Sequence, residues 1–318
     1  MSIPGVSIKT SEGAPLNMPI IGMGTSTIPA APTTTVTAAL VEAIKVGYRH
    51  FDTAALYGSE EPLGLAINEA LRLGLIASRD ELFITTKLWC NATQRHLVLP
   101  ALKKSLSELR LEYVDLYLIH GPLRLTQEVF QMPIPKDSIF HIDIKTVWEA
   151  MEECVNLGLT KAIGVSNFSS KRLQEILSFA RIPPVVNQVE MNPLWQQKEL
   201  KSFCEANNII LTAYAPLGAN GNSWGDNRIF ECNVLEDIAK SRGKTTAQVS
   251  LRWLYEQGVT MIPKSYNTRR MKENLDIFDW SLTKEELMKI SKLPQRKGFY
   301  ISSMTEASDV VREIDAEL

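Results

Sequence analysis

Three short runs decide the fold of this chain: YRHFD (residues 48–52), LFITTK (82–87) and VDLYLIH (114–120). Their length and their aromatic and β-branched content are typical of buried strands. Amphipathic segments of helical length separate them. Alternation of strand and helix predicts a parallel sheet, and in a closed parallel barrel the carboxyl ends of all strands meet on one face.

Polar residues stand at or just after these strand ends: Asp52, Tyr57, Lys87 and His120. A phenol with a pKa of about 10 is a poor proton donor near neutral pH, and a nearby ammonium lowers that pKa. A carboxylate would hold the ammonium in place, and an imidazole can hydrogen-bond a carbonyl oxygen. Each residue alone is explained by an ordinary structural role, but their joint placement predicts carbonyl chemistry with a hydride from a cofactor.

The rest of the chain continues the alternation. Strands are expected at 20–24, 48–52, 82–87, 114–120, 161–166, 185–190, 209–214 and 259–263. Helices are expected at 35–46, 60–73, 97–109, 144–157, 169–179, 197–206, 234–241, 247–256 and 269–278, with another opening at 283. Runs at 6–9 and 18–21 predict an N-terminal hairpin at the barrel floor. The pattern predicts a single α/β domain over residues 1–318, a (β/α)8 TIM barrel.

Three segments interrupt this regularity. Residues 123–143 show no clear period and contain two prolines, residues 218–228 are rich in glycine and asparagine, and a tail from about residue 295 has little periodicity. Long loops on the active face of a barrel usually carry function. We therefore expect the substrate to be contacted by loops 121–143 and 218–228 and by the tail.

Composition excludes several classes of protein. The chain has 318 residues, 45% hydrophobic and 22% charged, with a formal net charge of −2, which favours a large core and gives no reason to expect nucleic acid or an anionic membrane as partner. The four cysteines form no CxxC pair, so neither a metal site nor a disulfide framework is expected. There is no secretory leader and no run of ~20 apolar residues. A reduced, cytoplasmic protein is expected.

A dinucleotide site is indicated late in the chain. No GxGxxG follows a strand, and Gly22-Met23-Gly24 is too short for a Rossmann motif. The run IPKSYNTRRMKEN (262–274) instead combines a strand end, a loop and a helix start. Barrels commonly bind phosphate at such a place. Lys264, Ser265 and Arg270 would suit a ribose 2′-phosphate and favour NADP over NAD; the alternative is a helix with a solvated basic face.

Several motifs together resemble the aldo-keto reductases over essentially the whole length of the chain. They are GYRHFDTA (47–54), YGSE (57–60), TKLW (86–89), LYLIH (116–120), AIGVSNF (162–168) and IPKS (262–265). A narrower resemblance is to the plant branch that holds codeinone, methylecgonone and chalcone (polyketide) reductases. It is carried by SRDELFIT (78–85), PVVNQVEM (184–191) and SLRWLYEQG (250–258).

This resemblance implies an NADPH-dependent carbonyl reductase without a metal. Tyr57 matches the proton donor, Lys87 the residue that lowers its pKa, Asp52 the partner of Lys87, and His120 the residue that orients the carbonyl. The positions that match the cofactor site are Gly24, Thr25, Ser26, Asp52, Ser166, Asn167, Gln188, Tyr214, Pro216, Leu217, Gly218, Lys264, Ser265, Arg270, Glu273 and Asn274.

Within that set the resemblance assigns separate tasks. Ser166, Asn167 and Gln188 match the residues that hold the nicotinamide carboxamide, and Tyr214 matches the ring stacked on the nicotinamide. The loop at 216–218 matches the segment crossing the pyrophosphate. The residues that match the adenosine 2′-phosphate and adenine site are Lys264, Ser265, Arg270, Glu273 and Asn274.

One departure from the family bears on the substrate. Many members have His-Trp-Pro where this chain has His120-Gly121-Pro122. Losing an indole beside the histidine should widen the pocket and favour a bulky substrate over a small aldehyde. Ser26 is likewise small where animal relatives often carry tryptophan. The expected substrate contacts are Ser26, Trp89, His120, Gly121, Trp195 and Trp224.

The sequence therefore predicts NADPH-dependent reduction of a ketone on a bulky plant specialised metabolite, with an alkaloid ketone as the first choice and a monomeric enzyme. The alternatives are a polyketide reductase acting with a partner synthase, a cyclic imine reductase, and a non-catalytic NADPH-sensing subunit. A Schiff-base aldolase using Lys87 is a further alternative. Loss of turnover in Tyr57→Phe with NADPH binding retained would separate the reductase from the last two.

Overall fold

A computed structural model of the chain describes residues 3–10, 15–27, 31–130, 133–220, 225–303, 305 and 309–317. Within these residues, eight parallel strands form one sheet in which spatial order follows chain order. They are β3 (Met23–Gly24), β4 (His50–Asp52), β5 (Phe83–Leu88), β6 (Val114–Ile119), β9 (Thr160–Ser166), β10 (Val186–Glu190), β11 (Ile210–Tyr214) and β12 (Thr260–Met261).

The sheet closes on itself next to its first and last strands. Ile21 forms a parallel bridge with Met261, and the amide of Gly22 donates to the carbonyl of Met261 at 2.8 Å. The amide of Gly24 donates to the carbonyl of Pro263 at 3.1 Å. A Cβ on Gly24 would lie 2.9 Å from the carbonyl oxygen of Ile262, so the close approach requires glycine. The predicted (β/α)8 barrel is confirmed.

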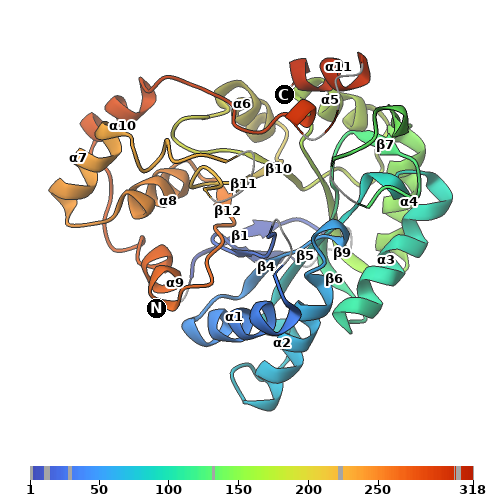
Figure 1. The fold of residues 1–318 in the computed structure, drawn as a ribbon. Helices are drawn as coiled ribbons and strands as arrows, with labels where there is room; N and C mark the ends of the chain where they lie inside the picture. Colours follow the sequence, from blue (N-terminus) through green and yellow to red (C-terminus); the bar gives the residue numbers. More distant parts are fainter. Residues whose placement is uncertain are drawn as a thin grey trace.

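Helices surround this sheet (Figure 1). They are α1 (Thr33–Val46), α2 (Glu60–Arg72), α3 (Arg95–Leu109), α4 (Ile144–Asn156), α5 (Ser170–Phe179), α6 (Lys198–Ala206), α7 (Asn233–Arg242), α8 (Thr246–Glu256), α9 (Thr268–Leu275), α10 (Lys284–Ser291) and α11 (Asp309–Glu317). Capping boxes at Thr245 and Thr283 fix the starts of α8 and α10, and Gly47 follows the end of α1 with φ of +122°. These local signals explain why most of the expected helices begin and end near the predicted residues.

The N-terminal hairpin closes the floor of the barrel, as predicted. β1 (Gly5–Ile8) pairs with β2 (Leu16–Pro19) in antiparallel register. Ile8 and Met18 are buried in one cluster with residues near the amino ends of the strands, including Phe83 and Val186. The opposite, carboxyl end of the barrel is left for the site.

Two irregular segments contain structure that the sequence did not reveal. In the 123–143 insertion, β7 (Leu123–Leu125) pairs with β8 (Ile139–His141); strands of three residues are too short to show a period of two. In the tail, α11 buries Val311 and Ile314 and packs against β8. Figure 1 shows α11 beside α5. With only two buried positions, contacts made by the folded chain, rather than local periodicity, define this helix.

No helix among the described residues is long and apolar enough to span a membrane.

A buried acid at the start of α2 makes the stability of the barrel depend on pH. Glu60 is 2% exposed, and its carboxylate accepts a hydrogen bond of 2.5 Å from the hydroxyl of Thr86. Burial raises the pKa of Glu60 to about 7, although hydrogen bonds from Thr86 and Ser105 oppose the shift.

We expect Glu60→Gln to remove part of this pH dependence. Between the ordinary pKa of 4.5 and about 7, the folded state holds a proton that the unfolded state has lost, so stability falls as pH rises through that window. The Glu60→Gln variant has no such window. Its free energy of unfolding relative to wild type should therefore increase by on the order of 2 kcal/mol between about pH 5 and about pH 8. Urea unfolding at both pH values measures this; parallel pH profiles would contradict it.

Candidate active site

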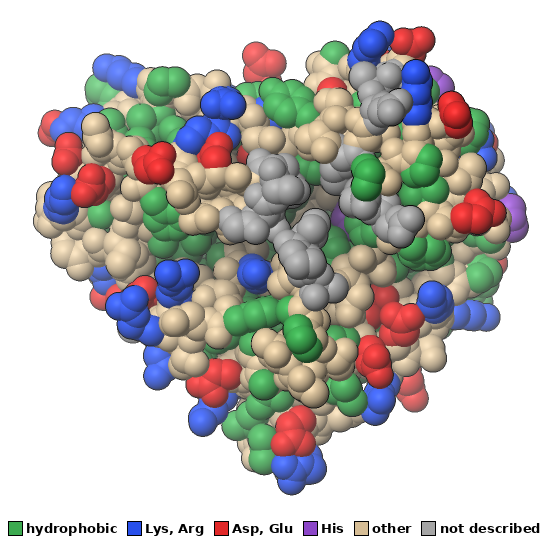
Figure 2. All heavy atoms as spheres, viewed as in Figure 1, with side chains coloured by type: hydrophobic (Ala, Val, Ile, Leu, Met, Phe, Trp, Pro, Cys, Tyr) green, Lys and Arg blue, Asp and Glu red, His purple; other side chains and the backbone are tan. Residues whose placement is uncertain are grey.

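The four residues predicted to act together meet at the carboxyl end of the barrel. Asp52 ends β4, Lys87 lies in β5, His120 follows β6 directly, and Tyr57 ends a short 3-10 helix, η1 (Ala55–Tyr57). Figure 2 shows this face hollowed near its centre. Asp52, Tyr57 and His120 line the cavity there, while Lys87 is fully buried behind them.

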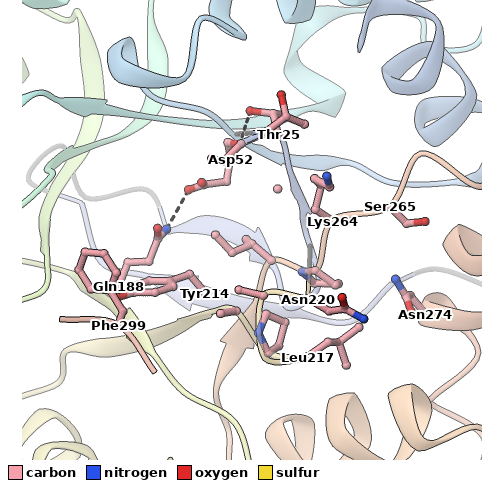
Figure 3. Close-up of a pocket in the computed structure, with 18 of the residues that line it drawn as sticks. Thr25, Asp52, Gln188, Tyr214, Leu217, Asn220, Lys264, Ser265, Asn274 and Phe299 are labelled. Carbon is pink, nitrogen blue, oxygen red and sulfur yellow. Dashed lines mark hydrogen bonds between the residues drawn. The ribbon is translucent and has the colours of Figure 1, made fainter. Parts of the chain in front are cut away.

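A buried ion pair forms the base of the site. The Lys87 ammonium donates to Asp52 Oδ1 at 2.5 Å and to the carbonyl of Thr53 at 3.0 Å. Asp52 Oδ2 accepts from Gln188 Nε2 at 2.8 Å, as Figure 3 shows. Both charged groups are buried and satisfied, so neither can be removed without leaving the other uncompensated.

Lys87 and Tyr57 are electrostatically coupled. The Lys87 nitrogen lies 4.9 Å from the centroid of the Tyr57 ring. Burial opposes the charge on Lys87, but attraction by Asp52 and Tyr57 raises its pKa. Burial also raises the pKa of Tyr57, and Lys87 acts in the opposite direction without reversing the shift. The sequence argument foresaw only the lowering by Lys87. A buried phenol that stays protonated at neutral pH is available as a proton donor.

His120 faces the hydroxyl of Tyr57. Tyr57 Oη lies 3.3 Å from His120 Nε2, and the two rings meet edge to face at 5.3 Å. Burial and the charge of Lys87 hold the pKa of His120 well below its usual range, so the imidazole is neutral. His120 Nδ1 is buried without a hydrogen-bond partner among the described residues. Because an unpaired acceptor costs less than an unpaired N–H, we assign the proton to Nε2, which directs it toward the cavity.

The residues expected around a nicotinamide are brought together beside this pair. The Tyr214 hydroxyl donates to Asn167 Oδ1 at 2.9 Å, and Asn167 Nδ2 donates to the carbonyl of His120 at 3.1 Å. Asn167 adopts a left-handed φ of +61°. The Ser166 hydroxyl donates to the carbonyl of Gln188 at 2.8 Å. Ser166, Asn167, Gln188 and Tyr214 all line the cavity.

The far end of the cavity contains the predicted phosphate-binding residues. Figure 3 shows Lys264, Ser265 and Asn274 together on the side opposite Gln188. The Lys264 side chain is exposed, and partial burial of its ammonium lowers its pKa. Asn267 caps α9 by accepting from the amide of Arg270 at 3.1 Å. The same cavity is also lined by Gly24, Thr25, Ser26, Pro216, Leu217, Asn220, Tyr266, Arg270 and Glu273.

This end fits a phosphorylated nucleotide. Lys264 and Arg270 supply cationic groups, and Ser265 supplies a hydroxyl beside the first turn of α9. The cavity that joins both ends measures about 1350 Å³, which is room for a large cofactor together with a substrate. Gly218 was predicted to contact the cofactor but does not line the cavity; its carbonyl accepts from the amide of Asp226 at 3.0 Å.

The substrate end agrees only in part with the predicted contacts. Ser26, Trp89 and Gly121 line the cavity with His120. Trp195 does not; its turn is closed by paired backbone bonds with Asn192 and is overlain by the tail, since the amide of Arg296 donates to the carbonyl of Leu194 at 2.8 Å. Trp224 lies outside the described residues.

Sequence reasoning did not name several residues that line this end: Leu56, Cys90, Leu123, Ile134, Phe299 and Ile301. Leu123, Ile134, Phe299 and Ile301 belong to segments expected to contact the substrate, but no local signal distinguishes an inward apolar side chain from an outward one. Among the described residues, no group of three or more His, Cys, Asp or Glu side chains could hold a metal ion.

Comparison with known proteins identifies the family of the chain. A sequence model of the Aldo/keto reductase family matches residues 20–294. A D-galacturonate reductase from Fragaria ananassa is 57% identical over 316 residues, covering 99% of each chain. The NADPH-dependent codeinone reductase 1-4 from Papaver somniferum is 58% identical over 297 residues, covering 93% of this chain and 92% of that protein. A Bombyx mori aldo-keto reductase, solved in complex with NADP, superimposes with a TM-score of 0.84 at 36% identity, covering 95% of this chain and 97% of that one.

Proposed function

The chain belongs to the aldo-keto reductase family and is an NADP-dependent oxidoreductase; on that premise, we propose that it reduces a ketone on a bulky plant specialised metabolite. One observation supports this above the others. The proton-bearing pair, Tyr57 Oη and His120 Nε2 at 3.3 Å, lies at the end of a cavity walled by apolar side chains, with glycine at position 121. A wide apolar wall around a proton donor suits a large carbonyl compound.

The residues of the chain divide the proposed reaction between them. NADPH, when bound, supplies the hydride. His120 Nε2–H hydrogen-bonds the carbonyl oxygen and orients it. Tyr57 gives its proton to that oxygen as negative charge develops there. Lys87 stabilises the phenolate that remains, and Asp52 keeps Lys87 charged and in place through the 2.5 Å contact. In the reverse direction the phenolate accepts the proton of the alcohol.

The charge of the pocket bears on the class of substrate. Among the described residues, the substrate end is lined by Leu56, Trp89, Cys90, Gly121, Leu123, Ile134, Phe299 and Ile301. None of these side chains carries a formal charge, so neither a carboxylate nor an ammonium of the substrate would find a counter-ion among them. We therefore propose a polycyclic ketone, such as an alkaloid, whose carbonyl enters first and whose charged group stays near the mouth.

A sugar acid is the second candidate. It is favoured by the D-galacturonate reductase, which matches 99% of this chain, tail included. Two further alternatives are a cyclic imine and a polyketide intermediate held by a partner synthase. None of the relatives described above is named as acting with a synthase.

A single assay separates these substrates. Loss of NADPH absorbance is followed with propanal, D-galacturonate, a morphinan ketone, a tropane ketone and a cyclic imine, and in a coupled assay with chalcone synthase. We expect the highest kcat/KM for a polycyclic ketone. Preference for D-galacturonate would replace that proposal with a sugar-acid reductase. NADPH binding without turnover of any compound would favour a sensing subunit.

Substitution of Gly121 tests whether the open wall sets the preference. Among the described residues, a Cβ at this position would meet only Cys90 Sγ, at 3.5 Å, so a larger side chain can enter the cavity beside His120. We expect Gly121→Trp to lower kcat/KM for the polycyclic ketone about tenfold or more, and to affect propanal far less.

Gly121→Ala is the matched control, because its added methyl makes only an ordinary van der Waals contact and should change neither substrate by much. Equal losses for both substrates in Gly121→Trp would mean that the indole disturbs His120 rather than fills the pocket.

A further inference from the structure

The first part of the tail forms one wall of the cavity through two side chains. Phe299 and Ile301 line the substrate end, and Ile301 is the first residue of η5 (Ile301–Ser303). Phe299 also meets the ring of Tyr214 edge to face, with centroids 6.2 Å apart; Figure 3 shows the two side by side. This segment is not a strand of the barrel sheet, so side-chain contacts must hold its backbone in place.

A carboxylate from the barrel holds the first part of this segment. Glu190, the last residue of β10, accepts from the amide of Gly298 at 3.0 Å and from the amide of Phe299 at 2.8 Å. It is 4% exposed. Burial raises its pKa, while the amides of Phe299 and Gly298 and the charges of Arg228 and Lys297 act in the opposite direction. The catalytic steps described above make no use of this group.

The contact at Gly298 leaves no room for a side chain. A Cβ there would lie 2.7 Å from Glu190 Oε1. The absence of a side chain therefore allows the tail backbone to reach the carboxylate. Glu190 is also paired with Tyr214 in the sheet register, so the same strand end supports the ring that Phe299 contacts.

A second carboxylate holds the next two residues. Asp315 on α11 accepts from the amide of Ile301 at 2.7 Å and from the amide of Ser302 at 2.9 Å. Lys297 is 8% exposed, forms an ion pair with Asp315 at 3.9 Å and is attracted by Glu190 as well. α11 is itself tied to α5, because Glu317 accepts from Arg172 Nε at 2.6 Å.

We propose that Glu190 and Asp315 are positioning residues that fix the backbone of residues 298–302 and thereby set the shape of the substrate pocket through Phe299 and Ile301. Each carboxylate takes two consecutive amides, and the four amides flank the two side chains that enter the cavity. The inference rests on the proposed function for its effect on substrates, but not for the amide bonds themselves.

The first measurement does not depend on activity. Hydrogen exchange of the tail peptide spanning 297–303 is compared between wild type, Glu190→Gln and Glu313→Gln. Glu190→Gln removes the negative charge and one of the two acceptor oxygens, which weakens the bonds from both backbone amides, so we expect exchange in the peptide to accelerate about tenfold or more. Glu313 is the matched control. It is exposed on α11, the helix that carries Asp315, lies 3.7 Å from Arg172 and is not among the acceptors of the tail amides given above. The Glu313→Gln variant should therefore exchange like wild type. Unchanged exchange in Glu190→Gln would overturn the inference.

The second measurement is a ratio of substrates. With 9,10-phenanthrenequinone as a rigid tricyclic probe and propanal as a small one, we expect Glu190→Gln to lower the ratio of their kcat/KM values about tenfold, mainly through KM for the quinone. Gly298→Ala, which disturbs the same contact without removing charge, should act in the same direction, and Asp315→Asn likewise. Faster exchange with an unchanged ratio would overturn the link to the pocket.

A double-mutant cycle identifies the side chain through which Glu190 acts. In a Phe299→Ala background, Glu190→Gln should change the ratio less than twofold, because the wall that it positions is already gone. Full additivity would overturn the role assigned to Phe299. If wild type reduces neither probe, the proposed function fails, and the exchange data alone decide whether the two carboxylates fix the tail.

Discussion

Tyr57→Phe is expected to abolish reduction, with kcat lower by on the order of a thousandfold, while NADPH binds with nearly its wild-type affinity. The hydroxyl is the group that faces His120 Nε2 at 3.3 Å, and burial keeps it protonated at neutral pH. Removing one oxygen takes away the proton and leaves the ring in place. Steady-state kinetics on the preferred substrate, with NADPH binding followed by quenching of tryptophan fluorescence, measures both effects.

The control for this variant is Tyr255→Phe on α8, where the ring packs against Phe278 at 5.2 Å, away from the cavity. It should leave kcat unchanged. Substantial turnover in Tyr57→Phe would falsify the assignment of Tyr57 as proton donor. Trapping of a substrate on Lys87 by borohydride, without any need for NADPH, would instead indicate an aldolase.

Lys87→Met is expected to reduce kcat by on the order of a hundredfold to a thousandfold and also to destabilise the fold. The ammonium is the group that opposes the effect of burial on Tyr57, so its loss raises the pKa of Tyr57 further and makes the phenolate harder to form. It also leaves the Asp52 carboxylate buried without its partner, which costs about 3–5 kcal/mol. Urea unfolding and kcat are measured on the same samples.

The two consequences of Lys87→Met can be separated. Adding Asp52→Asn replaces the unpaired carboxylate by a neutral amide and should recover much of the lost stability, but not kcat. Recovery of kcat together with stability would mean that Lys87 serves the fold alone.

The pH profile of wild type follows from the protonation of Tyr57. Reduction requires the protonated phenol, and burial raises the pKa of Tyr57. The rate of reduction should therefore stay constant through neutral pH and fall only above about pH 10.

The sequence predicted the barrel because its strand signals are local and strong. β5 and β6 are buried at every position and carry the aromatic and β-branched residues that are typical of strands. The meeting of Asp52, Lys87 and His120 followed from topology alone, since parallel strands bring their carboxyl ends to one face. What the sequence could not provide was the balance of forces on Tyr57, because the depth of burial that raises its pKa belongs to the folded site.

The pocket walls were less predictable for a different reason. The strands of the β7–β8 hairpin are too short for their periodicity to be seen. α11 is stabilised by contacts with segments far away in the chain, such as that of Glu317 with Arg172. Trp195 was expected at the substrate because tryptophan often lines such pockets, but the tail covers its turn. A residue type indicates what a side chain can do, and only the tertiary fold decides which way it faces.

The closure of the sheet between Ile21 and Met261 has a consequence for assembly. It is the seam of the barrel: its flanking strands, β3 and β12, have two residues each, and it joins segments 240 positions apart that are synthesised at opposite ends of translation. Gly24 and Lys264 line the same cavity from either side of that seam. A molecule that fills the cavity would contact both sides of the seam at once, so we expect NADPH binding to stabilise the closed barrel against opening at this place.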